Sequence, residues 1–463
     1  MPENTSPSSA SRFACLTERV RHSLTVKLVL IGAIILLLQI PTLMIYSLIA
    51  ERQSNRNQAV DEISRKWGSA QTVTGPFLSI PVREKRLRPA AQSTMPVTEE
   101  VRFHQLTFLP ETLNITGKLD PEIRYRGLYQ AVLYRSEITI EGEFKLPAEF
   151  RLSRLANAQT ELQDAILVIG ISDLKGISAE TVDINGVECK AIPGIPDTRL
   201  ASSGFQVPLT ALKDLKPGAT LRFSLKLNLN GSSALSFYPL GRTNTARLAA
   251  NWSSPSFTGE FLPAAREVTD TSFNAEWKIT DMNRNYPQSW LDDEFKIAGS
   301  EFGVGLHIQA NVYQQTMRAI HYSVLFIIFS MLAFLFAEIL SKVWMHPLQY
   351  LMAGLAVVLF YTLLLAFSEH LGFQCAYWIT TAATVGLLGL YCLLIFRRKI
   401  VAAAVAGVMA LTYILLYFML QLEDYALLTG SIVLFLLLAL VMVLTGNINR
   451  SRSCSADAAA PEN

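Results

Sequence analysis

Long apolar runs are distributed unevenly along this chain. One run lies near the N-terminus, at residues 26–50, and the others crowd the C-terminal third, at residues 322–340, 348–367, 376–396, 400–420 and 425–446. A helix of about 20 apolar residues crosses the hydrocarbon core of a bilayer. The pattern predicts a membrane protein with about six transmembrane helices, one N-terminal anchor and five in the C-terminal region.

Composition agrees with this class. Hydrophobic residues make up 51% of the chain and its mean hydropathy is +0.30. The net charge is only +2, and no dense Lys and Arg cluster is interleaved with aromatic residues, so nothing predicts a nucleic-acid surface. The lipid bilayer is the predicted partner.

The first apolar run resembles a secretory signal because basic residues such as Arg19 and Arg21 precede it. It is longer than an ordinary signal core, and Leu48-Ile49-Ala50 lacks the small residue expected three positions before a cleavage site. We therefore expect an uncleaved anchor at residues 26–50.

The positions of Lys and Arg predict the orientation. If the N-terminal tail is cytoplasmic, Lys342, the cluster at 397–399 and Arg450 all fall on the cytoplasmic side, whereas the short opposite loops lack Lys and Arg. This predicts a multi-pass membrane protein with cytoplasmic tails at residues 1–25 and 447–463. Residues 51–317 are then a periplasmic domain in a Gram-negative cell, and residues 318–446 a helix bundle.

The inserted domain has the alternation of strands. Apolar residues occupy every second position from Phe223 to Leu229, and Asn230-Gly231 follows as a turn signal. The pattern predicts a β-rich domain, and its length fits either one large sandwich or two smaller domains. The spacing of Val60, Ile63 and Trp67 predicts one apolar face of a short connecting helix. This helix either packs against the domain with its other side in water or lies on the membrane surface.

Catalytic and metal-binding signatures are missing. Cys189 is the single cysteine of the inserted domain, which excludes an internal disulfide, and neither zinc-type Cys spacing nor His-Glu-x-x-His occurs. Ser172 and Lys175 match the Ser-x-x-Lys of penicillin-interacting enzymes, but the other two motifs of that chemistry are absent. We expect no cofactor and no enzymatic activity.

One acidic residue falls inside an apolar run. Glu338 lies near the predicted cytoplasmic end of its span, and Lys342 follows at the favourable i,i+4 spacing. We expect an interfacial ion pair between them. Because no span has a charged residue at its middle, a proton relay through the bundle is disfavoured.

Two groups of residues are candidate sites. Glu369, His370, Glu423 and Asp424 fall on the predicted outer face of the bundle, where they can bind a cation, move a proton or dock the domain above. Ordinary polar loops at the ends of the helices are the alternative explanation, and the simpler one. Within the inserted domain Trp252, Phe257 and Phe261 form either a packed corner of the sheet or an aromatic docking surface.

Several separate segments resemble one family. They are GPFLSIP at 75–81, RYRGLY at 124–129, FYPLG at 237–241, WSSPSFTGEFLP at 252–263, HPLQY at 346–350, SEHLGF at 368–373 and EDYALL at 423–428. In their order along nearly the whole chain they resemble the CreD family of bacterial inner-membrane proteins. The resemblance implies a cell-envelope integrity protein whose expression answers to a two-component system, with links to envelope stress, colicin tolerance and β-lactam response. It implies no catalytic residues.

Two classes of function remain open. In the first, the protein is structural, and its periplasmic domain contacts envelope proteins or cell-wall components. In the second, the bundle is a carrier or membrane-embedded enzyme for a lipid or cell-wall precursor, with its mouth at Glu369, His370, Glu423 and Asp424. Small residues such as Gly354 also leave open a helix-pairing face with another copy.

Overall fold

The computed structural model describes residues 24–88, 98–150, 155, 157–196, 199–211, 216–308 and 312–421, with isolated residues between 428 and 442. The chain divides into two compact units. The first, the helical unit, comprises residues 1–55 and 310–463, and the second, the β unit, comprises residues 56–309. Each unit is described by itself.

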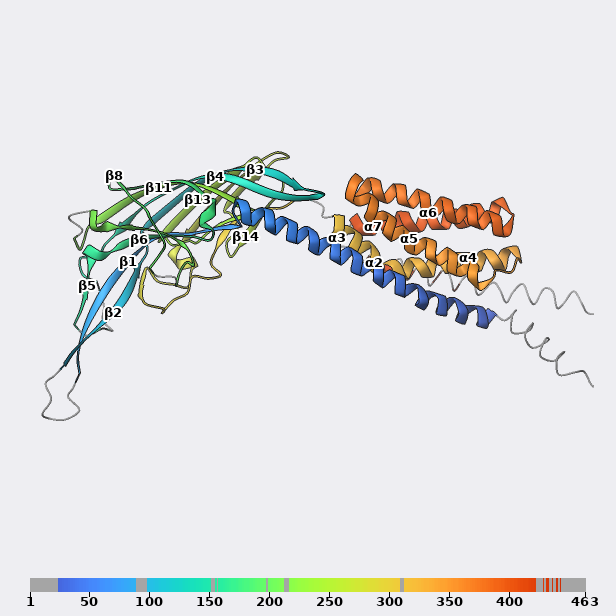
Figure 1. The fold of residues 1–463 in the computed structure, drawn as a ribbon, viewed down its shortest axis with the longest axis horizontal. Coiled ribbons are helices and arrows are strands. Elements are labelled where there is room, and N and C mark those ends of the chain that lie inside the picture. The colour runs from blue at the N-terminus through green and yellow to red at the C-terminus, as the bar shows by residue number, and fades with distance from the viewer. Residues whose placement is uncertain are drawn as a thin grey trace, which may run out of the picture. The chain divides into compact units, whose positions relative to one another are not determined.

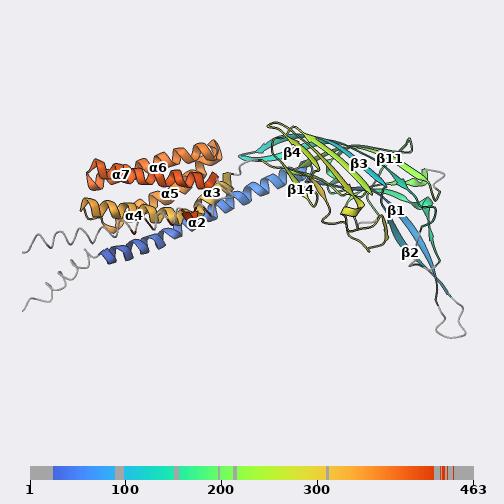
Figure 2. The same ribbon diagram turned by 180° about the vertical axis from the view of Figure 1, so that it is seen from behind.

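The helical unit is built from long apolar helices (Figure 1 and Figure 2). Helix α2 begins at Leu24 and ends at Trp67, so the expected anchor and connecting helix form one continuous element. The remaining helices are α3 (Val312–His321), α4 (Ser323–Ser341), α5 (Pro347–Leu371), α6 (Phe373–Phe396) and α7 (Lys399–Gln421). Within the described residues, α2 and α4 to α7 are long and apolar enough to cross a membrane.

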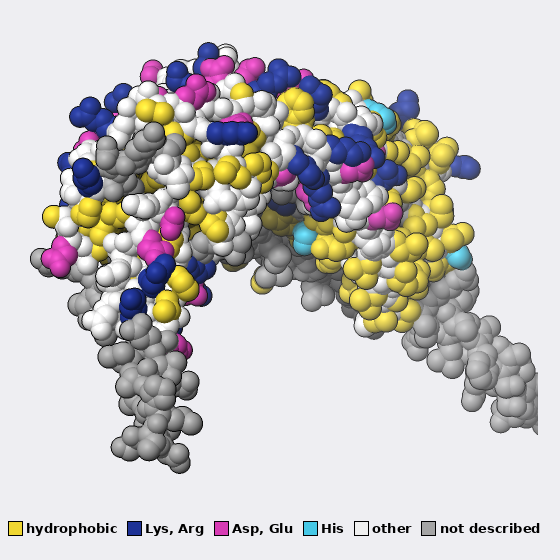
Figure 3. All heavy atoms as spheres, turned by 60° about the vertical axis from the view of Figure 1, so that its left-hand side comes forward, with side chains coloured by type: hydrophobic (Ala, Val, Ile, Leu, Met, Phe, Trp, Pro, Cys, Tyr) yellow, Lys and Arg dark blue, Asp and Glu magenta, His cyan; other side chains and the backbone are white. Residues whose placement is uncertain are grey.

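The predicted membrane class and the N-terminal and C-terminal groups of helices are confirmed. The expected last span, at residues 425–446, lies outside the continuously described residues. In Figure 3 hydrophobic side chains cover the face of the helical unit, whereas charged side chains are scattered over the β unit. Apolar side chains exposed on a helix surface are suited to contact with lipid.

Local chemistry sets the start of α5. The side chain of His346 accepts a hydrogen bond from the Leu348 backbone N–H at 3.3 Å, and Gln349 Oε1 accepts one from the His346 N–H at 2.9 Å. Pro347 occupies the first helical position, where its missing N–H leaves no bond unmade. The helix therefore begins where the sequence predicts.

The β unit contains two sheets. The first has the strand order β14-β18-β12-β1-β6-β10-β9, with β2 and β5 pairing with β1, and β17 with β2. Its strands are β1 (Gln71–Arg88), β2 (Thr98–Phe108), β5 (Ala158–Thr160), β6 (Ile166–Ile171), β9 (Ile192–Pro193), β10 (Gly204–Pro208), β12 (Ala234–Phe237), β14 (Pro255–Gly259), β17 (Ser289–Leu291) and β18 (Phe302–Leu306).

The second sheet has the order β15-β16-β13-β3-β4-β11-β7-β8. Its strands are β3 (Thr112–Arg126), β4 (Tyr129–Lys145), β7 (Ile177–Ile184), β8 (Val187–Cys189), β11 (Thr220–Ser232), β13 (Thr243–Ala250), β15 (Ala265–Val268) and β16 (Phe273–Thr280). Short 3-10 turns lie at Leu162–Asp164, Leu174–Gly176, Leu209–Ala211 and Asp281–Asn283. Most neighbours are antiparallel, but β1 pairs with β12, and β3 with β13, in parallel.

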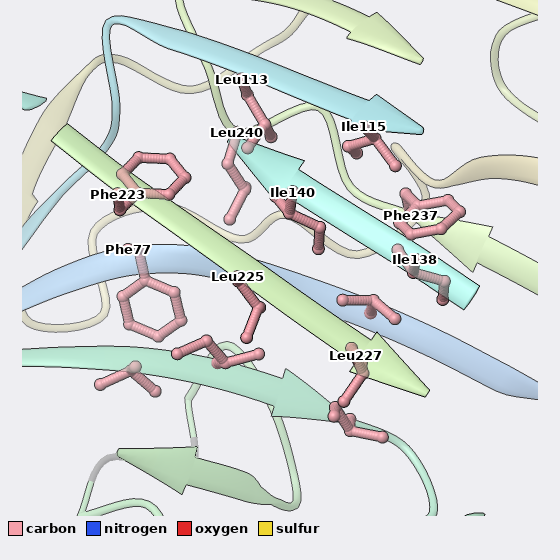
Figure 4. Packing of buried hydrophobic residues seen from close by; sticks show 14 of the residues in the cluster. Phe77, Leu113, Ile115, Ile138, Ile140, Phe223, Leu225, Leu227, Phe237 and Leu240 are labelled. Atoms are coloured by element: carbon pink, nitrogen blue, oxygen red, sulfur yellow. The ribbon is translucent and has the colours of Figure 1, made fainter. Parts of the chain in front are cut away.

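One apolar core joins the two sheets. Figure 4 shows Phe77 from β1 facing Leu225 from β11, with Ile140 from β4 close by, and all of them are buried. Alternate residues of β11 point into this core because successive side chains of a strand lie on opposite faces. Since the core is continuous, the β unit is one two-sheet domain and not two smaller ones.

Candidate functional site

The predicted outer-face cluster begins at the C-terminal end of α5. Tyr313 of α3 is buried, and its hydroxyl donates a hydrogen bond to Glu369 Oε1 at 3.0 Å. Glu369 is half-buried, whereas His370 is exposed. Glu423 and Asp424 lie outside the described residues. In the described part of the cluster, the carboxylate therefore fixes α3 against α5.

The predicted docking residues lie at the edge of the β core. The ring of Phe257 makes T-shaped contacts with Phe273 at 6.0 Å and Trp277 at 5.8 Å. The indole N–H of Trp277 donates to the carbonyl of Phe261 at 3.0 Å, and that of Trp252 donates to Ser254 at 3.2 Å. Trp252, Phe257 and Phe261 are half-buried and pack against the core, so packing at a sheet corner accounts for their contacts.

The Ser-x-x-Lys match has a structural role. Ser172 Oγ accepts a hydrogen bond from the Thr72 N–H at 2.9 Å and donates to the Ala70 carbonyl at 3.0 Å. Asp173 caps the following 3-10 turn by accepting from the Lys175 N–H at 3.2 Å. These bonds hold the turn to the start of β1.

A charged site that the sequence did not predict lies between α2, α4 and α5. Glu338 of α4 is only 5% exposed, and its carboxylate forms an ion pair with the ammonium group of Lys27 of α2. The prediction that Glu338 pairs with Lys342 is wrong. Lys342 lies one residue beyond α4 with a left-handed backbone, φ 54°, and its side chain is exposed. The helical i,i+4 geometry therefore does not extend to it.

Two further donors complete the surroundings of Glu338. The hydroxyl of Tyr350 donates to Glu338 Oε2 at 2.7 Å, and the Met345 N–H donates to Oε1 at 3.1 Å. A carboxylate taken out of water needs such partners, because burial of an unpaired charge costs several kcal/mol. Lys27, Tyr350 and Met345 together make burial of Glu338 possible.

A small cavity of about 180 Å³ adjoins this site. The start of α2 lines one side of it, and the loop between α4 and α5, together with the first turn of α5, lines the other. The lining residues are Val26, Lys27, Leu30, Ile31, Trp344, Met345, Pro347 and Tyr350. The ion pair is thus bordered by apolar side chains, and two charges attract each other more strongly in such surroundings than in bulk water.

Interlocking aromatic rings occupy the interior of the bundle. The ring of Phe360 lies 4.5 Å from Tyr413, 5.7 Å from Tyr377 and 5.1 Å from Tyr361 between ring centroids. Tyr377 donates to the carbonyl of Tyr413 at 2.6 Å. The buried hydroxyls of Tyr361 and Tyr413 have no hydrogen-bond partner among the described residues.

The β unit contains a second charged group that the sequence did not predict. His104 of β2 lies between two carboxylates, with Nδ1 at 2.7 Å from Asp292 Oδ2 and Nε2 at 3.3 Å from Glu84 Oε2. The Asp292 hydrogen bond, aided by Glu84, raises the pKa of His104 although burial opposes the rise. Burial raises the pKa of Asp292, but hydrogen bonds from the Gln105 N–H and His104 outweigh it and lower that pKa overall.

Neither charged group had a signal in local spacing. Glu338 and Lys27 are 311 positions apart, and His104 and Asp292 are 188 apart. Tyr350 stands within the HPLQY segment, but nothing in that segment indicates its partner. Among the described residues no group of three or more His, Cys, Asp or Glu side chains is arranged to hold a metal ion.

Apolar helices at both ends of the chain, with a two-sheet domain inserted after the first, define a multi-pass membrane protein with one large β-rich domain. Residues 23–451 match the family model described as inner membrane protein CreD. The chain is also 32% identical, over 423 residues, to inner membrane protein CreD of Escherichia coli (strain K12). The aligned region covers 91% of this chain and 92% of that protein. The chain therefore belongs to the CreD family of inner-membrane proteins, as its motifs predicted.

Proposed function

We propose that this protein supports cell-envelope integrity and the envelope-stress response as a non-enzymatic structural protein. In this proposal the helices anchor the β unit, which contacts envelope proteins or cell-wall components. The observation that carries the proposal is the aromatic packing inside the bundle, where Phe360 lies against Tyr361, Tyr377 and Tyr413. Interiors filled by interlocked rings are suited to a rigid anchor.

In the proposed orientation the β unit faces the periplasm and both termini face the cytoplasm. Lys342 follows the end of α4, and Arg397 and Arg398 separate α6 from α7. The turn between α5 and α6, at Gly372, has no Lys or Arg. The positive-inside rule supports placing the basic loops in the cytoplasm.

A carrier or membrane-embedded enzyme for a lipid or cell-wall precursor is the second candidate. Buried hydroxyls inside the bundle favour it, because Tyr361, Thr380, Thr381 and Tyr413 each have a side-chain oxygen with no partner among the described residues. Unpaired polar groups in a membrane interior are unfavourable, and a polar ligand would satisfy them. Its mouth would lie at Glu369, His370, Glu423 and Asp424.

The two functions are separated by rescue of envelope permeability. Uptake of an excluded dye after detergent challenge is measured in a deletion strain that expresses wild type, Glu369→Ala, His370→Ala, Glu423→Ala or Asp424→Ala at equal protein level. The structural proposal expects increased uptake in the deletion strain and full rescue by all four variants. Unchanged uptake on deletion contradicts the envelope role itself.

Tyr313→Phe is the matched control for Glu369. Both Tyr313→Phe and Glu369→Ala remove the hydrogen bond that joins α3 to α5. If Glu369→Ala fails to rescue while Tyr313→Phe rescues fully, the carboxylate acts beyond helix packing. That result would contradict the structural proposal and favour the carrier or enzyme.

A further inference from the structure

The hairpin of β3 and β4 extends beyond the core of the β unit. The two strands pair without interruption from Thr112 with Glu143 to Arg126 with Tyr129. Buried and exposed residues alternate along β3 up to Asp120, but every residue from Glu122 to Arg126 is exposed. We call residues 122–130 the arm. Because both faces of β3 are exposed over this segment, the arm lies outside the core between the two sheets.

One face of the arm contacts the last residues of α2, which belong to the β unit. Arg126 forms an ion pair with Glu62, and the guanidinium of Arg124 lies 5.1 Å from the centroid of the Trp67 ring. Arg124 also pairs with Glu122 at 3.1 Å. Because alternate residues of a strand share a face, Arg124 and Arg126 both point to α2.

The opposite face of the arm is apolar and exposed. Ile123 and Tyr125 alternate with the two arginines, so they point away from α2. Tyr125 is 66% exposed and Ile123 is 39% exposed, and Leu128 in the turn is 49% exposed. Three large apolar side chains grouped at the end of a projecting hairpin are typical of an interaction surface.

The connection of the chain limits which surface lies within reach. Glu62, the partner of Arg126, follows Ala50, the last residue of the first apolar run, by twelve residues. Twelve residues span at most about 40 Å even when fully extended. The chain therefore tethers the arm within this distance of the bilayer that α2 enters, which raises the effective concentration of that surface above that of a freely diffusing partner.

We propose that the apolar face of the arm, Ile123, Tyr125 and Leu128, rests in the interfacial layer of the same bilayer. Tyrosine is enriched in that layer because its ring is apolar and its hydroxyl is polar. The contact gives the β unit a second attachment to the membrane besides the chain itself, and so restricts its orientation. This role does not depend on the proposed envelope function.

Spin labels in the full chain test this contact. Tyr125→Cys and Leu128→Cys are labelled in a cysteine-free background and reconstituted in nanodiscs of phosphatidylethanolamine and phosphatidylglycerol. Val187→Cys, 49% exposed in the same unit, is the control. We expect labels at 125 and 128 to be more accessible to oxygen than to a water-soluble nickel chelate, and the label at 187 to show the reverse.

Nickel accessibility at 125 and 128 equal to that at 187 would overturn the proposal. Low accessibility to both reagents would also overturn it, in favour of contact with protein. A second measurement keeps all native cysteines and places photoreactive benzoylphenylalanine at position 125. Lipid adducts after illumination support the proposal, and protein adducts or none contradict it.

Discussion

Lys27 and Glu338 form an ion pair, with Glu338 buried and Lys27 half-buried, although 311 positions of sequence separate them. Lys27 precedes the inserted β unit in the sequence and Glu338 follows it, so the ion pair joins the N-terminal and C-terminal parts of the helical unit. Gly354 of α5 also lies close to the side chain of Leu38 in α2, the helix that contains Lys27. The first helix is therefore a packed member of the bundle as well as an anchor.

Removal of one partner of this ion pair should be strongly destabilising. Glu338→Ala leaves the half-buried ammonium group of Lys27 without its carboxylate. Loss of one member of a fully buried pair costs about 3–5 kcal/mol, so we expect a loss of at most that size. We expect earlier unfolding of the helical unit in detergent, measured by thermal denaturation. The double variant Lys27→Met/Glu338→Leu should recover part of the loss, because no charge is left unpaired, although the Tyr350 hydroxyl and the Met345 N–H still lack their acceptor. A double variant as unstable as Glu338→Ala would contradict this account.

Tyr350→Phe isolates the hydrogen bond to Glu338. Hydrogen bonds to charged groups contribute about 1.5–3 kcal/mol, so we expect a loss in that range. Tyr361→Phe is the matched control in the same helix, because the Tyr361 hydroxyl has no partner among the described residues. Its removal should be neutral or stabilising. Equal losses for the two variants in the same thermal assay would show that ring packing, and not the bond to Glu338, is responsible.

Gly354 is predicted to be intolerant of larger residues. A Cβ atom at this position would lie 2.2 Å from Leu38 Cδ1 of α2 and 2.9 Å from Met331 Cε of α4. Gly354→Leu should separate α2 from α5 and destabilise the helical unit by about 1–3 kcal/mol. Disulfide trapping between cysteines placed in α2 and α5 reports the separation directly. Gly386→Leu is the control, since a Cβ there meets no atom within 4 Å.

The stability of the β unit should depend on the charge of His104. Asp292 and Glu84 raise the pKa of His104 in the folded protein. The stabilisation from the charged imidazolium is therefore fully present at pH values below the pKa of an unfolded His, about 6.5. That stabilisation, about 1–2 kcal/mol, is lost as the pH rises through the folded pKa. Asp292 stays ionised throughout this window because its own pKa is lowered.

Tryptophan fluorescence during thermal unfolding at pH 6 and pH 8.5 measures this effect. Glu84 and Arg199 also face the group, and Arg199 lies 3.3 Å from Asp292. We expect wild type to lose stability from pH 6 to pH 8.5, and His104→Asn to lose much less. The same pH dependence in both proteins would assign the effect to another group.

Local sequence patterns predicted the elements. The lengths of apolar runs located α2 and α4 to α7, alternation located β11, and His346-Pro347 located the start of α5. These features depend on neighbouring residues, so a single sequence contains them. The same reasoning gave the wrong partner for Glu338, because the i,i+4 rule assumes that the helix continues, and α4 ends at Ser341.

The sequence by itself determined the membrane class from the lengths of apolar runs, the β-rich nature of the insertion from the alternation of apolar residues, and the family from its motifs. Tertiary structure decided which charges meet. Lys27 with Glu338, and His104 with Asp292, come from distant segments that only folding brings together. It also showed that Trp252 and Phe257 pack against the β core, while Tyr125 of the same domain is exposed. The burial of a side chain depends on which residues surround it in space, and the spacing of residues along a single sequence does not specify those neighbours.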